Sequence, residues 1–168
     1  MNRLQFIASL ATLPYAVKAF GEETSDEKKI IKFLEKSKSI NMWMEGMKYN
    51  TYEAHILNRD GLIVYKVQYS KSVKEEEAAM NYFLLINIQE SGSKKRYLAF
   101  DFNLDENVDV YIEPPYLGDT MIMDSIDDAM RIRNGIQIKN KNLKSIDDRI
   151  NETFRGELKE IVKLLGIK

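Results

Sequence analysis

The chain has 168 residues with 25 basic and 26 acidic side chains, and it contains no cysteine. This length corresponds to one ordinary domain, and a net charge of −1 provides no basic surface of the kind that nucleic-acid-binding proteins use. The absence of cysteine excludes disulfide bonds and thiolate chemistry within these residues.

The beginning of the chain has the pattern of an export signal. Arg3 supplies positive charge, and residues 4–17 are mostly apolar but too few to span a bilayer. We therefore expect cleavage after Ala19, an exported protein (periplasmic or secreted), and a single α+β domain over residues 20–168. The alternative is an ordinary N-terminal amphipathic helix. The remaining chain has no apolar run long enough for a transmembrane segment.

A helix and then a series of strands are predicted after the signal. Thr24 and Glu27 fit a capping box for an amphipathic helix over about residues 25–39. Residues 40–48 fit either an extension of this helix or the start of a strand. Five segments have the alternation or the β-branched and aromatic content typical of strands: Tyr49–Leu57, Leu62–Tyr69, Asn81–Gln89, Lys94–Asn103 and Val108–Ile112. Their short connections, including Asp60-Gly61, favour an antiparallel meander.

Two helices are predicted to follow the strands. Residues 118–123 fit a short strand, after which Ser125 and Asp128 fit a capping box that opens a short helix ending at Arg133. A longer helix follows, with one continuous apolar stripe: Ile146, Ile150, Phe154, Leu158, Ile161, Val162 and Leu165. The predicted fold is therefore α+β, with an antiparallel sheet of about five strands and with the helices packed on one face.

Tyrosines are frequent on the predicted strands, and Tyr65, Tyr69, Tyr82 and Tyr97 are candidate binding residues. A tyrosine ring combines an apolar body with a polar tip, which suits a binding surface, although strand preference alone also explains these residues. No nucleophile motif or phosphate-binding loop is present. The sequence therefore favours a small exported binding or interaction module that is not catalytic. Its expected partner is a protein or a small apolar ligand, and no cofactor is expected.

The only histidine, His55, suggests an alternative. A histidine can act as a general base near neutral pH, so an exported enzyme with a site of Asp, Glu and Tyr side chains that includes His55 remains open. A pocket that joins His55 to two acids would favour the enzyme. A flat, exposed surface of tyrosines and methionines would favour the binding module.

Soft ligands near residue 45 suggest a second alternative. Met42, Met44 and Met47, together with His55, are candidate ligands for Cu(I), because thioethers and imidazole suit this ion. Methionine and tryptophan that fill gaps in the core would produce the same pattern.

Asp101, Asn103 and Asp105 have the spacing of the first ligands of a calcium loop. The loop departs from that pattern because its sixth position is Glu106 and its twelfth is Ile112. A solvated turn between two strands explains the same residues, so no metal is predicted.

Overall fold

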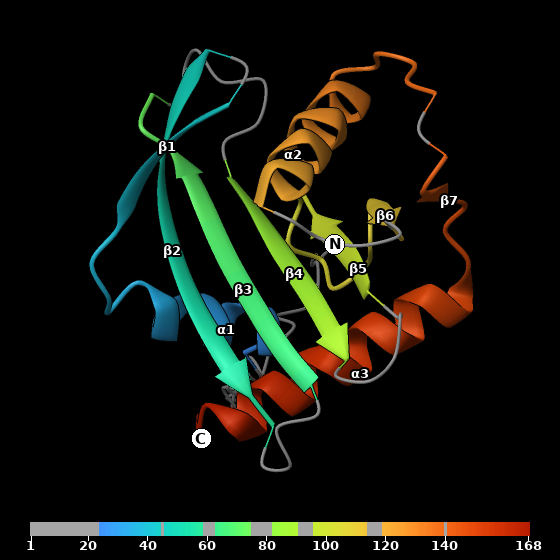
Figure 1. The fold of residues 1–168 in the computed structure, drawn as a ribbon. Coiled ribbons are helices and arrows are strands. Elements are labelled where there is room, and N and C mark those ends of the chain that lie inside the picture. The colour runs from blue at the N-terminus through green and yellow to red at the C-terminus, as the bar shows by residue number, and fades with distance from the viewer. Residues whose placement is uncertain are drawn as a thin grey trace, which may run out of the picture.

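The computed structural model describes residues 24–44, 46–58, 63–74, 82–90, 96–113, 119–139 and 141–168. The predicted export signal and the predicted Asp60-Gly61 turn lie outside these residues. Within them the chain is α+β, with one antiparallel sheet of seven strands and three helices (Figure 1).

The elements follow one another along the chain in this order: α1 (Asp26–Leu34), β1 (Ile40–Met44), β2 (Met47–Leu57), β3 (Ile63–Ser72), β4 (Tyr82–Glu90), β5 (Arg96–Asp101), β6 (Val110–Ile112), α2 (Asp119–Arg133), β7 (Leu143–Lys144) and α3 (Asp148–Leu164). Each strand pairs with the next one, so the sheet is a meander from β1 to β7. The five predicted strands correspond to β2–β6. The predicted strand count was too low, because β1 and the two-residue β7 were not recognised. The short strand predicted at residues 118–123 is wrong, since Asp119–Met123 belongs to α2.

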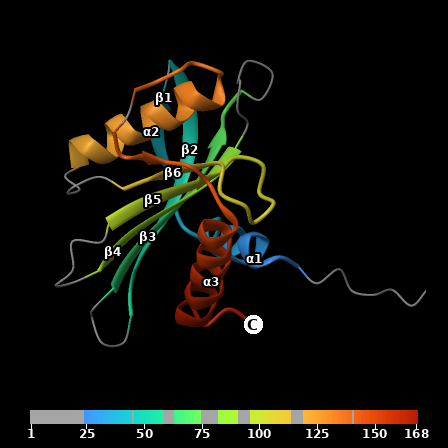
Figure 2. The ribbon, with the colours of Figure 1, turned by 90° about the vertical axis from the view of Figure 1, so that its right-hand side faces the viewer.

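Helices cover both faces of the sheet, as Figure 2 shows. α1 and α3 pack on one face, and α2 packs on the other. The predicted packing of all helices on one face is therefore wrong for α2. The alternation along β4 explains the arrangement: Leu84 and Ile86 belong to the core under α1 and α3, whereas Phe83 and Leu85 belong to the core under α2.

Side chains at the N-caps of α1 and α3 accept main-chain N–H groups of the first helical turn. The side chain of Ser25 accepts a hydrogen bond from the N–H of Lys28, so the N-cap of α1 is Ser25 and not the predicted Thr24. Asp147 caps α3 in the same way through the N–H of Ile150. The apolar stripe predicted for the last helix faces the sheet, since Phe154, Leu158 and Ile161 are buried.

Candidate functional site

The β1 strand forms an outer edge of the sheet, because β2 is its only neighbour among the described strands (Figure 1). The register pairs Met44 with Met47 across a tight turn, and Gly46 in this turn has a φ of 75°. Glycine reaches this left-handed conformation without a steric penalty, so a tight β1–β2 hairpin can form here.

The hydrogen bonds of β2 determine which main-chain groups of β1 point outward. The N–H of Val73 donates to the carbonyl oxygen of Lys48 at 3.0 Å, so the main-chain groups of Lys48 face β3. Trp43 is the β1 partner of Lys48 and therefore forms a non-hydrogen-bonded pair with it. The N–H and C=O of Trp43 consequently point away from the sheet. Asn41, two residues earlier on the strand, has the same orientation.

β1 lacks the side chains that commonly prevent a sheet edge from pairing with another chain. Its sequence, Ile-Asn-Met-Trp-Met, contains neither a charged residue nor proline, and natural edge strands commonly use both to block pairing with another chain. Ile40 is 49% exposed and Trp43 is 64% exposed. The edge therefore combines outward main-chain donors and acceptors with exposed apolar side chains.

Two further exposed apolar side chains lie on the same side of the sheet as Trp43. Val73 is 48% exposed and Tyr82 is 37% exposed. Lys48 on β2 lies between Trp43 and Val73, so these two residues are two strands apart, about 10 Å. Tyr82 pairs with Lys71 and lies on β4, three strands from β1, which is about 14 Å. We call these three residues the Trp43 patch. α1 and α3 pack against the opposite end of this face (Figure 2), so no described helix covers the patch.

The predicted tyrosines do not form one surface. Tyr65 and Tyr69 are buried, being 2% and 6% exposed. The hydroxyl groups of Tyr65 and Tyr97 donate to the two carboxylate oxygens of Glu157 on α3, at 2.8 and 3.3 Å. Burial, followed by the nearby Glu157 carboxylate, raises the pKa of both phenols, so they remain protonated donors under α3. Only Tyr82 belongs to the exposed patch.

His55 meets one acid on an open strand surface. Its Nε2 lies 3.7 Å from Oε1 of Glu53, and Lys66 approaches the other oxygen of Glu53 at 3.5 Å. The His55 side chain is 61% exposed. A hollow of about 230 Å³ lies elsewhere and has no acid in its lining, which consists of Thr24, Lys29, Lys32, Phe33, Lys36, Ile167 and Lys168. The described contacts therefore do not join His55 to the two acids that an enzyme site would require.

The methionines of the predicted copper site pack against the core under α2. Met44 is 1% exposed, and Met42 and Met47 are partly buried against the same core. Met42 is paired with Tyr49 on β2, and His55 lies six residues further along the same strand. Six strand residues span about 20 Å, so the described structure does not bring His55 to these methionines.

The candidate calcium residues hold the turn between β5 and β6. Oδ1 of Asp101 accepts hydrogen bonds from the N–H groups of Asn103 and Leu104, at 3.0 and 2.6 Å. Asp105 accepts the N–H of Asn107 and the side-chain amide of Asn103. Across the described ranges no three His, Asp or Glu side chains converge as a metal site requires. These oxygens therefore satisfy the N–H groups and amide of their own turn.

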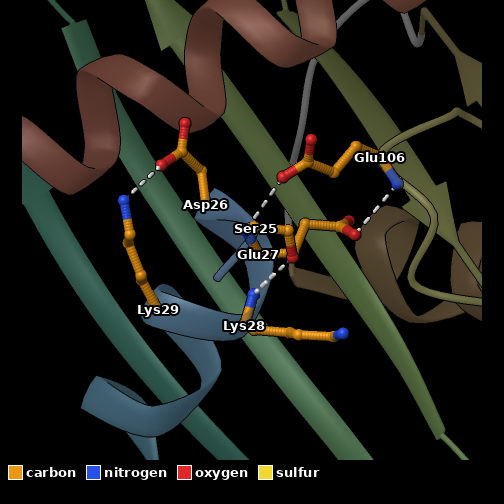
Figure 3. A network of polar contacts seen from close by, with 6 residues as sticks. All are labelled: Ser25, Asp26, Glu27, Lys28, Lys29 and Glu106. Atoms are coloured by element: carbon orange, nitrogen blue, oxygen red, sulfur yellow. Dashed lines mark hydrogen bonds and ion pairs between the residues drawn. The ribbon is translucent and has the colours of Figure 1, made fainter. Parts of the chain in front are cut away.

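Glu27 joins this turn to α1, as Figure 3 shows. Its Oε2 accepts the N–H of Glu106 at 3.0 Å, and Oε1 of Glu106 accepts the N–H of Glu27 at 3.4 Å. Glu27 and Asp101 are both fully buried. Burial, with a hydrogen bond to Asp101, raises the pKa of Glu27 to about 9. Glu27 therefore keeps its proton at neutral pH, and its carboxyl group lies beside that of Asp101 without solvent access.

Sequence reasoning missed both Trp43 as an exposed residue and Glu27 as a partner of Asp101. The exposure of Trp43 depends on which side of β1 faces the core. The contact between Glu27 and Asp101 joins residues far apart in the chain.

No protein-family model matches this chain, and neither a curated protein nor a solved structure is significantly similar to it. In the part of the chain that the structure describes, no helix has the length and apolar character needed to cross a membrane. Its function must therefore be argued from the geometry of the site.

Proposed function

We propose that this protein is a small exported binding module that accepts an extended segment of a partner protein along the outer edge of β1. The proposal rests on the exposure of Trp43, which is 64%. This residue lies on an edge strand without charged residues, and its main-chain N–H and C=O point outward from the sheet. An edge of this kind is a template for an added strand.

Two kinds of contact would hold the added strand. The N–H and C=O groups of Asn41 and Trp43 would form main-chain hydrogen bonds, each worth about 0.5–1.5 kcal/mol net. Such bonds depend little on the partner's sequence, so they supply affinity more than selectivity. The Trp43 patch would add apolar contact, and tryptophan is among the residues that contribute most to binding at protein interfaces. Selectivity would therefore come from side chains that pack on the Trp43 patch.

A photo-crosslinking side chain at position 43 tests the proposal in cells. The expected result is a covalent adduct with a polypeptide from position 43 and none from position 55. His55 is a suitable control because it is exposed and also on a strand, but it lies on β2 and not at the edge. Adducts of equal yield at both positions, or no adduct at position 43, would refute binding at this edge.

A further inference from the structure

We infer that the strand added to β1 is the β1 strand of a second copy of this chain, related by a two-fold axis at Met42. This inference rests on the proposed function, since it requires that the edge of β1 accepts a strand. It adds the identity of the partner and the register of the pairing.

The outward main-chain groups determine the register. In an antiparallel pair, hydrogen bonds form between residues whose main-chain groups face each other, and these pairs alternate with non-hydrogen-bonded pairs. Asn41 and Trp43 are the outward-facing residues of β1. A two-fold axis at Met42 places Asn41 opposite Trp43 of the second copy, and Trp43 opposite its Asn41. An axis at Asn41 or at Trp43 would leave one of these two residues of each copy without a partner on β1.

The side chains are self-complementary in the same register. Residues 40–44 carry no charge, so two copies can approach without the repulsion that opposed like charges produce. Ile40 of one copy lies opposite Met44 of the other in this register, and Met44 is buried in its own copy, so this position brings no charge to the pairing. The two Trp43 side chains lie on the same face of the joined sheet as diagonal neighbours, about 7–8 Å apart and within reach of each other.

The far edge of the sheet favours closure as a dimer. β7 has only two residues, and Lys144 on it forms an ion pair with Glu113 at 3.5 Å. A head-to-tail contact between β1 and β7 would therefore form few main-chain hydrogen bonds. Pairing of β1 with β1 uses the five-residue edge of both copies, and the two-fold symmetry then leaves no β1 edge for a third copy. A five-residue edge is small for a stable interface, so we expect an equilibrium that depends on protein concentration.

A disulfide tests the register directly, because the chain has no cysteine of its own. In the proposed dimer Met42 of one copy lies opposite Met42 of the other in a non-hydrogen-bonded pair. Their Cα atoms are about 4.5 Å apart, which is within disulfide range. The variant Met42→Cys of the full chain should form a covalent dimer under mild oxidation. The matched control Ile40→Cys lies opposite Met44 and should crosslink at least about tenfold more slowly, because its sulfur lacks a partner in range.

Two further measurements guard against a folding artefact. Asn41→Pro removes an outward N–H while leaving the β1–β2 hydrogen bonds in place, so combining it with Met42→Cys should abolish the crosslink without lowering the Tm. The unmodified protein supplies the second measurement, because Trp43 is its only tryptophan. The Trp43 fluorescence should shift to shorter wavelength as protein concentration rises, since pairing buries the ring.

The outcomes separate this inference from the proposed function. Equal crosslinking at positions 40 and 42, or none at 42 together with a constant Trp43 spectrum, would overturn the pairing with a second copy. If position 43 still forms a photo-adduct with a different polypeptide, the edge binds another partner and the proposed function survives. If position 43 forms no adduct at all, both proposals fail.

Discussion

The buried pair of Glu27 and Asp101 predicts an unusual dependence of stability on pH. Burial and the hydrogen bond to Asp101 raise the pKa of Glu27 from 4.5 to about 9 in the folded protein. In the unfolded chain the carboxyl group returns to its ordinary value. Between about pH 5 and pH 9 the folded state therefore binds one more proton than the unfolded state, so the free energy of unfolding must fall as pH rises.

The expected slope follows from one proton. A full proton difference changes the free energy of unfolding by about 1.4 kcal/mol per pH unit. Burial also raises the pKa of Asp101, which acts in the same direction. The variant Glu27→Gln should remove most of the slope, because an amide can still donate to Asp101 but does not titrate.

Urea melts at pH 5, 6, 7 and 8 measure this slope. Asp26→Asn is the matched control: Asp26 also lies in the first turn of α1, but it pairs with Lys29 at the surface and should leave the slope unchanged. A flat or rising profile in the parent protein would refute the shared proton. So would a Glu27→Gln variant that keeps the parent's slope.

Two other predictions concern the core and the start of the chain. Phe154 is 2% exposed in the core between α3 and the sheet, so Phe154→Ala should lower the free energy of unfolding by about 3–5 kcal/mol in urea melts. The control Glu152→Ala, on the exposed side of α3, should change it by less than about 0.5 kcal/mol. Export should remove the first nineteen residues, so the intact mass of protein from the cell envelope should begin after Ala19. A mass that retains Met1–Ala19 would contradict export.

The central strands could be predicted because their side chains alternate. In β3, Tyr65, Val67 and Tyr69 face the core under α1 and α3 while Lys66 between them does not, and this period of two is visible in the sequence. β1 lacks such a signal, since four of its five residues are apolar and either face could be buried. β7 is too short to show any period.

The second helical layer had a signal that the prediction did not use. Phe83 and Leu85 on β4, with Leu98 and Phe100 on β5, give the sheet a second apolar face, and an apolar face must be covered. α2 covers it with Ile126, Ala129 and Met130. The tyrosines were a different problem. Alternation places Tyr65 and Tyr97 on the face that α3 covers, but no local pattern connects their hydroxyl groups to Glu157 of α3.

The two sides of β1 have separate roles, and this separation is what makes the edge testable. Met42 and Met44 on one side pack against the core under α2, so they supply the contacts that hold β1 in the sheet. Trp43 on the other side leaves most of its ring in water, so burial of Trp43 contributes little to folding. A change at Trp43 should consequently alter pairing at the edge while leaving the fold intact. A change at Met44 should destabilise both the fold and the pairing at the edge.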